Sequence, residues 1–353
     1  MKAFQRLVGN TRIVRLEGPS RLTGCNIFAK CEYENPGGSV KDRAALWMIK
    51  NALKSGELVE GKSGLIVEGT AGNTGIGLAM AGNCYGFQSV IVLASSQSQE
   101  KKDMLRQAGA ILIEVPPVPF ANENNYVHVA ARLADKLRER SHRVMYANQW
   151  DNMANRQAHI DSTGPEIWRQ LKGKVDAFSC AMGTGGTLTG VGSSLRSLSN
   201  KKTKIALTDP PGAKLFRYYT EGRLEAVGSS ITEGIGQGRI TGNMEGFTPD
   251  MAFEIQDEDA LNALWDVHAH EGLAVGGSSG TNIAGAIRVA KELGPGHTIA
   301  TILCDLGSRY ASKLYNAEFL ASKDLPLPPW EIGSSIEPLK KDVNLAALDV
   351  MVK

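Results

Sequence analysis

Cysteines are few in this sequence, and their arrangement argues against two classes of protein. Five cysteines are spread over 353 residues, an odd number, and none forms a Cys-x-x-Cys pair. Secreted disulfide scaffolds and zinc ribbons need paired or closely spaced cysteines. We therefore expect reduced thiols and a cytoplasmic location.

The sequence also lacks long apolar segments and an excess of charge. No stretch approaches the ~18 uninterrupted apolar residues of a membrane span, and residues 1–6 contain no signal-peptide core. Lysine and arginine (39 residues) nearly balance aspartate and glutamate (37), so the net charge is +2. Nucleic acids and anionic membranes are bound largely through excess positive charge, so we expect neither as a partner.

Several motifs of common enzyme classes are absent as well. The sequence has no Walker loop, no His-Glu-x-x-His zinc motif and no Gly-x-Ser-x-Gly nucleophile elbow. The segment from Gly183 matches the first two glycines of the dinucleotide fingerprint Gly-x-Gly-x-x-Gly, but Leu188 stands at the position of the last glycine. The fingerprint is therefore incomplete. The six histidines are dispersed, and we interpret them as structural residues without a metal site.

What the sequence does have is a regular alternation of expected strands and helices. Its strand segments are short and almost wholly apolar, which is typical of parallel sheets covered by helices on both faces. We predict an α/β fold with two mainly parallel sheets and a ligand cleft at the carboxyl ends of their strands. The strands are expected at 13–16, 26–30, 64–68, 89–93, 110–115, 143–146, 177–181, 204–208 and 298–304, and the main helices at 40–55, 76–85, 99–108, 125–140, 164–171, 259–270 and 281–293.

The segment Asn35-Pro36-Gly37-Gly38-Ser39-Val40-Lys41-Asp42-Arg43 places a lysine in the first turn of a helix. Ser39 followed by Asp42 is a capping-box pattern, so Ser39 is the predicted N-cap. A cation is disfavoured at the positive end of the helix dipole, which favours the free amine that Schiff-base chemistry needs at Lys41. The alternative is an ordinary surface lysine.

A glycine-rich stretch, Gly183-Thr184-Gly185-Gly186-Thr187, lies between an expected strand and a helix start. Successive backbone N–H groups and the helix dipole favour a phosphate there, and the two threonines add hydroxyl donors. With the Walker and dinucleotide patterns missing, the predicted ligand is a phosphate of mononucleotide size. The alternative is a tight turn without a ligand.

Three further polar segments can face the same cleft. The amides and hydroxyls of Thr70-Ala71-Gly72-Asn73-Thr74 can hold a carboxylate, and Asn73 can donate to a phenolate oxygen. Ser278 and Ser279 precede an expected helix in a glycine-rich loop, where they either place a hydroxyl on a ring nitrogen or act as N-caps. Gln149 follows a strand end and either reaches the cleft or lies on the surface.

In combination, these motifs resemble the fold type II family of pyridoxal-phosphate enzymes, and more narrowly its cysteine synthase and cystathionine β-synthase group. The resemblance runs from Val8 to about Tyr310. The motifs, in order, are the Asn35-to-Arg43 segment, Gly72-Asn73-Thr74-Gly75, Gly183-Thr184-Gly185-Gly186-Thr187, Glu233-Gly234-Ile235-Gly236 and Ser278-Ser279-Gly280.

The resemblance implies a tryptophan synthase β-like fold and a role for each motif. Residues 36–152 are expected to form a smaller, mobile domain that binds the substrate carboxylate. Residues 1–35 and 153–330 are expected to form a larger cofactor-binding domain, and 331–353 a C-terminal tail. The implied site has Lys41 in a Schiff base with pyridoxal 5′-phosphate, Asn73 at the cofactor's 3′ oxygen and Ser278 at its pyridine nitrogen. The residues implied around the cofactor's phosphate are Gly183, Thr184, Gly185, Gly186 and Thr187. Those implied at the substrate carboxylate are Thr70, Ala71, Gly72, Thr74 and Gln149.

The resemblance also implies an activity, a cysteine synthase that joins O-acetylserine and sulfide. One alternative is a cysteine desulfhydrase, which eliminates sulfide from cysteine and releases pyruvate and ammonia. Ala71, where cysteine synthases usually have serine, keeps that alternative open. A second alternative is a catalytically idle homologue with a binding or regulatory role. The expected partners are a small amino-acid substrate, sulfide, a second copy of the chain and serine acetyltransferase.

Overall fold

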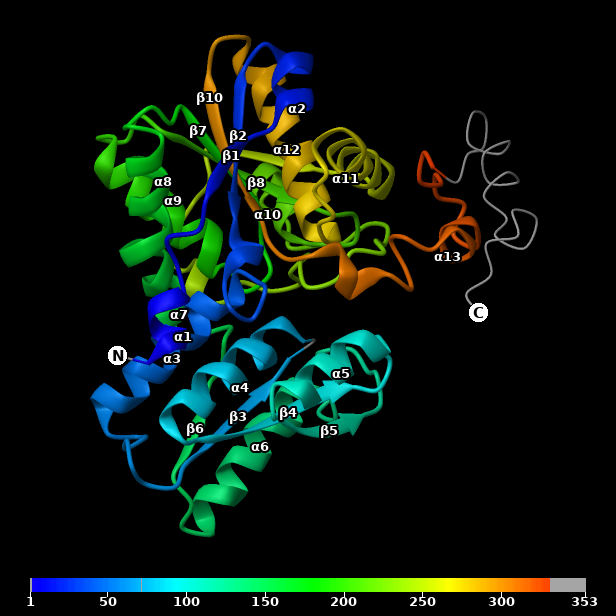
Figure 1. The fold of residues 1–353 in the computed structure, drawn as a ribbon. Helices are drawn as coiled ribbons and strands as arrows, with labels where there is room; N and C mark the ends of the chain where they lie inside the picture. Colours follow the sequence, from blue (N-terminus) through cyan, green and yellow to red (C-terminus); the bar gives the residue numbers. More distant parts are fainter. Residues whose placement is uncertain (1, 71, 331–353) are drawn as a thin grey trace, which may run out of the picture.

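The computed structural model describes residues 2–70 and 72–330, which form two units side by side (Figure 1). The large unit is built on a six-stranded sheet of order β1-β2-β10-β7-β8-β9, and the small unit on a four-stranded sheet of order β5-β4-β3-β6. All strand pairs are parallel except β1 with β2. The predicted α/β fold with two mainly parallel sheets is therefore confirmed.

The large sheet joins the beginning of the chain to its end. β2 (Asn26–Cys31) lies between the antiparallel β1 (Ile13–Arg15) and the parallel β10 (Thr298–Leu303). The remaining strands are β7 (Ala177–Ala181), β8 (Lys204–Asp209) and β9 (Met251–Glu254). β7 and residues 205–209 of β8 are buried, because helices cover both faces of the sheet.

Two apolar layers sandwich the large sheet. On one face pack α2 (Glu17–Thr23), α11 (Asp257–Glu271) and α12 (Gly277–Leu293). On the other face pack α8 (Gly164–Gln170), α9 (Gly186–Leu198) and α10 (Leu215–Glu221). The large unit also contains the short helices α7 (Met153–Ala158) and α13 (Ala317–Ala321), the π-helical turn η2 (His159–Thr163) and the 3₁₀ turns η1 (Glu32–Glu34), η3 (Gly242–Met244) and η4 (Gly307–Tyr310). The first helix, α1 (Ala3–Leu7), instead packs its buried Phe4 against the small unit.

The small unit repeats the arrangement around β5 (Ile111–Val115), β4 (Gln88–Ala94), β3 (Leu65–Gly69) and β6 (Val144–Tyr146). Apolar side chains of α3 (Lys41–Ser55) and α4 (Asn73–Tyr85) pack on one face of this sheet. α6 (Tyr126–Glu139) covers the other face. The remaining helix, α5 (Gln99–Gln107), lies beside α4 and β5.

A buried ion network ties α3 to the large unit. The guanidinium of Arg43 donates to both carboxylate oxygens of Glu32 (2.7 Å each) and to both of Glu166 (2.8 Å each). Lys30 adds an ion pair of 2.8 Å with Glu166. Burial alone raises the pKa of Glu166, but Arg43 and Lys30 outweigh it and hold that pKa at about 2. Since Arg43 lies two residues after Lys41, this network fixes the helix start that carries Lys41.

Several predicted boundaries differ from those observed. α4 begins at Asn73 and α12 at Gly277, three and four residues earlier than the expected 76 and 281. Both starts are rich in glycine, which has low helix propensity, but close packing favours it there. A Cβ on Gly280 would lie 2.4 Å from the carbonyl oxygen of Ala260, so the glycine allows α12 to approach α11. α2, α10 and β9 were not predicted.

Candidate functional site

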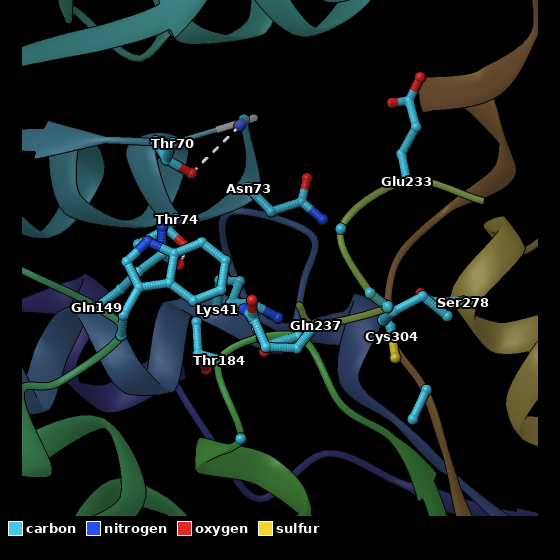
Figure 2. A pocket seen from close by; sticks show the side chains of 18 of the residues that line it. Lys41, Thr70, Asn73, Thr74, Gln149, Thr184, Glu233, Gln237, Ser278 and Cys304 are labelled. Carbon is cyan, nitrogen blue, oxygen red and sulfur yellow. Dashed lines mark hydrogen bonds between the residues drawn. The ribbon is translucent and has the colours of Figure 1, made fainter. Parts of the chain in front are cut away.

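One cavity of about 420 Å³ is lined by residues of both units, and each motif of the predicted site contributes at least one residue to the lining, although Gly186 itself does not line it. Loops that follow the strands of both sheets supply its walls, as expected for the carboxyl ends of parallel strands. Figure 2 shows Lys41, Asn73, Thr184 and Ser278 arranged around it. Residues more than 230 positions apart in the sequence therefore meet at a single site.

Lys41 is the first residue of α3 and is half-buried in the cavity wall. The predicted capping box is wrong, because Val40 occupies the N-cap position. The Asp42 carboxylate instead accepts a 2.5 Å hydrogen bond from the backbone N–H of Gly37, and burial raises the pKa of Asp42 to about 7. Ser39 accepts from the backbone N–H of Lys41 at 3.3 Å. The turn before α3 is thus closed by Asp42 rather than by Ser39.

The predicted phosphate loop connects β7 to α9, as expected. Its shape depends on two glycines: Gly185 has a φ of 89°, and a Cβ on Gly183 would lie 2.4 Å from the carbonyl oxygen of Gly234. Thr184 and Thr187 both line the cavity. The loop therefore presents hydroxyls and the N-terminus of α9 at one end of the cavity, which suits a phosphate group.

The predicted carboxylate loop lies at the end of β3 and runs into α4. Thr70 accepts from the backbone N–H of Gly72 at 3.3 Å (Figure 2), and Gly72 has a φ of 147°. Thr74 donates to the side-chain oxygen of Gln149 at 2.5 Å, and Nε2 of Gln149 donates to the Gly69 carbonyl at 3.5 Å, so one Nε2 hydrogen of this cavity-lining residue remains for a ligand. Gln149 is buried and not a surface residue. Ala71 lies outside the described residues.

The Asn73 amide is held by two buried residues that the sequence reasoning missed. Its Nδ2 donates to Asp305 at 2.7 Å, and its Oδ1 accepts from Arg309. Asp305 also accepts at 2.7 Å from the hydroxyl of Tyr310. One Nδ2 hydrogen of Asn73 remains available to a ligand. Asp305, Arg309 and Tyr310 follow β10, so the end of the last strand orients a side chain of the small unit.

Ser278 and Ser279 lie in the first turn of α12 and have different partners. Ser278 lines the cavity beside Cys304, whereas Ser279 accepts a 2.8 Å hydrogen bond from the Cys304 backbone N–H. Neither serine is the N-cap, a position that Gly276 occupies. Burial raises the pKa of Cys304 to about 11, so this thiol stays neutral next to Ser278.

Two more residues at the cavity, Glu233 and His159, were not assigned a role from the sequence. Glu233 forms ion pairs with Lys101 of α5 and with Lys313 of the large unit, so it bridges the two units at the cavity. His159 lies fully buried beneath the phosphate loop, 3.3 Å from the Thr187 hydroxyl. The family motif gives Glu233 directly, but only the distance between His159 and Thr187 indicates a role for the histidine.

Comparison with known proteins identifies the family. Residues 4–305 match the family described as pyridoxal-phosphate dependent enzyme. The chain belongs to this family. It is 46% identical to cysteine synthase 1 of Neurospora crassa over 98% of this chain and 89% of that protein. It is 48% identical to cysteine synthase 1 of Emericella nidulans over 90% of this chain and 85% of that protein.

Solved structures agree with the family assignment. An O-ureido-L-serine synthase has a TM-score of 0.80 and 29% identity, covering 96% of this chain and 99% of that one. The O-acetylserine dependent cystathionine beta-synthase of Helicobacter pylori has a TM-score of 0.77 and 29% identity, covering 89% and 98%.

The residues of the cavity fit pyridoxal phosphate, the cofactor of this family. The cavity offers the primary amine of Lys41, which, unlike that of Lys101, has no carboxylate partner among the described residues, a hydroxyl at Ser278 and a glycine cradle that a Cβ at Gly183 would fill. An aldehyde, a ring nitrogen and a phosphate therefore each find a suitable group. Among residues 2–70 and 72–330, no cluster of His, Cys, Asp and Glu could hold a metal ion. Within the same ranges, every helix is too short or too polar to span a bilayer.

Proposed function

We propose that this enzyme makes L-cysteine from O-acetylserine and sulfide. The observation that carries the proposal is the meeting of Lys41, the carboxylate loop and the phosphate loop in one cavity. Relatives covering most of the chain are named cysteine synthase, and one solved relative is named as O-acetylserine dependent. These names support O-acetylserine as the substrate.

The predicted site residues then have defined roles in this reaction. When bound, pyridoxal phosphate supplies an electron sink that weakens the bonds at the substrate α carbon. The Thr70 hydroxyl, which accepts from the Gly72 N–H and keeps its own hydrogen free, and the remaining Nε2 hydrogen of Gln149 hold the carboxylate, which places the α hydrogen near the Lys41 amine. The Nζ of Lys41 takes this proton as general base.

The remaining polar groups hold the cofactor. Gly183 through Thr187 bind the phosphate, the free Nδ2 hydrogen of Asn73 binds the 3′ oxygen, and Ser278 meets the pyridine nitrogen. A neutral hydroxyl at that nitrogen stabilises carbanionic charge less than a carboxylate would. Loss of the β-acetoxy group from the substrate therefore competes better with transamination.

The test compares two reactions of the purified, cofactor-loaded protein. Cysteine is measured after addition of O-acetylserine and sulfide, and pyruvate after addition of cysteine alone. We expect cysteine formation to be the faster reaction. Pyruvate formation that outpaces it would instead identify the desulfhydrase that the sequence leaves open.

We further propose that residues 36–152 close over the substrate. We also propose that the chain works as a homodimer in the cytoplasm and that serine acetyltransferase is a partner. The ion pairs of Glu233 across the cavity support closure. One relative is named a putative mitochondrial cysteine synthase, from Saccharomyces cerevisiae, so cell fractionation must test the compartment. Light scattering with and without the acetyltransferase tests both assemblies.

A further inference from the structure

The two threonines of the phosphate loop rest on two buried polar side chains. Asn155 of α7 donates from Nδ2 to the Thr184 hydroxyl oxygen at 2.9 Å and to the carbonyl oxygen of Gln149 at 2.8 Å. His159, four residues later, has its Nε2 3.3 Å from the Thr187 hydroxyl. The exposed fractions of Asn155 and His159 are 2% and 1%, so both residues act from below the loop and not from the cavity.

Glycines of α9 create the space that these side chains occupy. A Cβ on Gly186 would lie 2.2 Å from Oδ1 of Asn155, and a Cβ on Gly190 would lie 2.6 Å from Cβ of His159. Gly186 and Gly190 are also four residues apart, so one face of α9 is left open to α7 and η2. Two glycines are thus matched to two polar side chains beneath the loop.

The direction of the hydrogen bond at Thr184 follows from its partner. The Asn155 atom that faces the Gln149 carbonyl has to be the amide nitrogen Nδ2, because a carbonyl oxygen only accepts, and an amide nitrogen only donates. The Thr184 oxygen therefore accepts, and its own hydrogen is free to point into the cavity. A hydroxyl oriented in this way can donate to an anion, whereas one with its hydrogen turned inward would present a lone pair to it.

The hydrogen bond at Thr187 depends on the tautomer of His159. Burial lowers the pKa of His159 to about 3, so the ring is neutral and carries one N–H. Its other nitrogen, Nδ1, lies 2.8 Å from the Thr163 hydroxyl. With the proton on Nε2, Thr163 donates to Nδ1 and Nε2 donates to Thr187, whose hydrogen then faces the cavity. With the proton on Nδ1, Thr187 has to donate inward.

We propose that Asn155 and His159 form a buried donor pair that turns the hydroxyl hydrogens of Thr184 and Thr187 toward the cofactor's phosphate. His159 is then a positioning residue in its Nε2–H tautomer. The inference rests on the cofactor assignment but not on the cysteine synthase reaction, because its readout is cofactor binding rather than turnover.

The first experiment measures the dissociation constant of pyridoxal phosphate for the apoprotein. Leucine at position 159 removes the donor, whereas glutamine keeps an N–H near the place of Nε2. We expect His159→Leu to weaken binding about tenfold, because the loop then loses one hydrogen bond that orients a donor toward the charged phosphate. His159→Gln keeps a donor and should stay within about threefold of wild type. In a Thr187→Val background, His159→Leu should add little, because the group through which it acts is gone.

Two results would overturn this role: a folded His159→Leu protein that binds the cofactor as wild type does, or an equal loss in the Thr187→Val background. Near-ultraviolet circular dichroism verifies that each variant is folded. A second experiment needs no variant. Long-range ¹H–¹⁵N spectra of histidine-labelled, cofactor-loaded protein distinguish the two tautomers, and the Nδ1–H form at His159 would refute the proposal even if every variant failed to fold.

Discussion

Lys41 is held in place by its neighbours in the chain. The Val40 N–H donates to the Cys304 carbonyl at 2.9 Å, Asp42 closes the preceding turn, and Arg43 is anchored in the buried ion network. The helix start therefore cannot shift without breaking contacts to the residue that follows β10 and to the buried ion network. A reactive amine has to be held within a small distance of its target, and these contacts provide that precision.

Replacing the amine tests its role directly. We expect Lys41→Ala to lower cysteine formation by a factor of at least about 10³, because the proposed general base is lost. Borohydride reduction of the loaded protein should label the wild type at position 41 and leave the variant unlabelled at that position. Lys50→Ala, an exposed lysine on the same helix, is the matched control and should keep full activity. Undiminished turnover in Lys41→Ala would refute the catalytic assignment.

Among the elements, α3 depends most on buried charge. In Arg43→Met, Glu32 and Glu166 lose their main partner inside the protein, so we expect the free energy of unfolding to fall by about 3–5 kcal/mol. Arg106→Met, which removes solvent-accessible ion pairs with Asp103 and Glu114, should cost less than about 1 kcal/mol. Urea titrations measure both values. Equal losses in the two variants would show that the network does not stabilise α3.

The same network predicts how stability responds to acid. Glu166 has an ordinary pKa of 4.5 and a folded-state pKa of about 2. A depressed pKa stabilises the folded state above pH 4.5, and this stabilisation disappears as the pH falls toward 2. His159 adds to the same trend, because its pKa is 6.5 in the unfolded chain and about 3 in the folded protein. As the pH falls from 6.5 toward 3, the unfolded state takes up this proton first and the folded state loses stability.

Strand β3 carries a carboxyl group with the opposite behaviour. Glu68 is fully buried, and burial raises its pKa from 4.5 to about 8. The unfolded state loses this proton first, so stability falls as the pH rises from about 4.5 to 8. We expect Glu68→Gln to be more stable than wild type at pH 8 and no more stable at pH 4. Thermal unfolding at the two pH values measures this, and an advantage independent of pH would contradict it.

At this scale the sequence predicted the repeating strands and helices better than their ends. The apolar strands β3, β4, β7, β8 and β10 were recognisable because both of their faces are largely buried. The early starts of α4 and α12 were not, since glycine and asparagine favour loops locally and the packing against α11 that stabilises Gly280 is a tertiary contact. The motif residues Lys41, Thr184 and Ser278 could be recognised from the sequence, whereas Asn155 and His159 act through other side chains and carry no local signal.

For the whole molecule, Glu233 is one of the residues that join the units at the cavity, and it does so through ion pairs. Lys101 and Lys313 outweigh the effect of burial and lower the pKa of Glu233, so it carries a negative charge between two cations. Lys101 also packs beside Gly72 in the carboxylate loop and over the ring of Tyr310. Lys101 therefore links Glu233 of the large unit to the carboxylate loop, so the proposed closure of the small unit would act on that loop through one side chain.

Neutralising this residue should weaken substrate binding more than chemistry. We expect Glu233→Gln to raise the KM for O-acetylserine about tenfold with a smaller change in kcat, because an ion pair that favours the closed state is lost. Faster hydrogen exchange in α5 should accompany it. Glu221→Gln, which removes an exposed pair with Arg223, is the control and should change neither value. A loss confined to kcat would place Glu233 in the chemical step instead.

The pairing of β2 with β10 has a consequence for synthesis on the ribosome. All strands of the small sheet lie between residues 65 and 146, so that sheet can assemble soon after it emerges. β2, made earlier, has to wait for residues 298–303 before its parallel neighbour exists. Until then the nascent chain exposes an apolar strand edge, a surface prone to aggregation that chaperones bind. Ribosome-associated chaperones should therefore remain bound to this chain until translation is nearly complete.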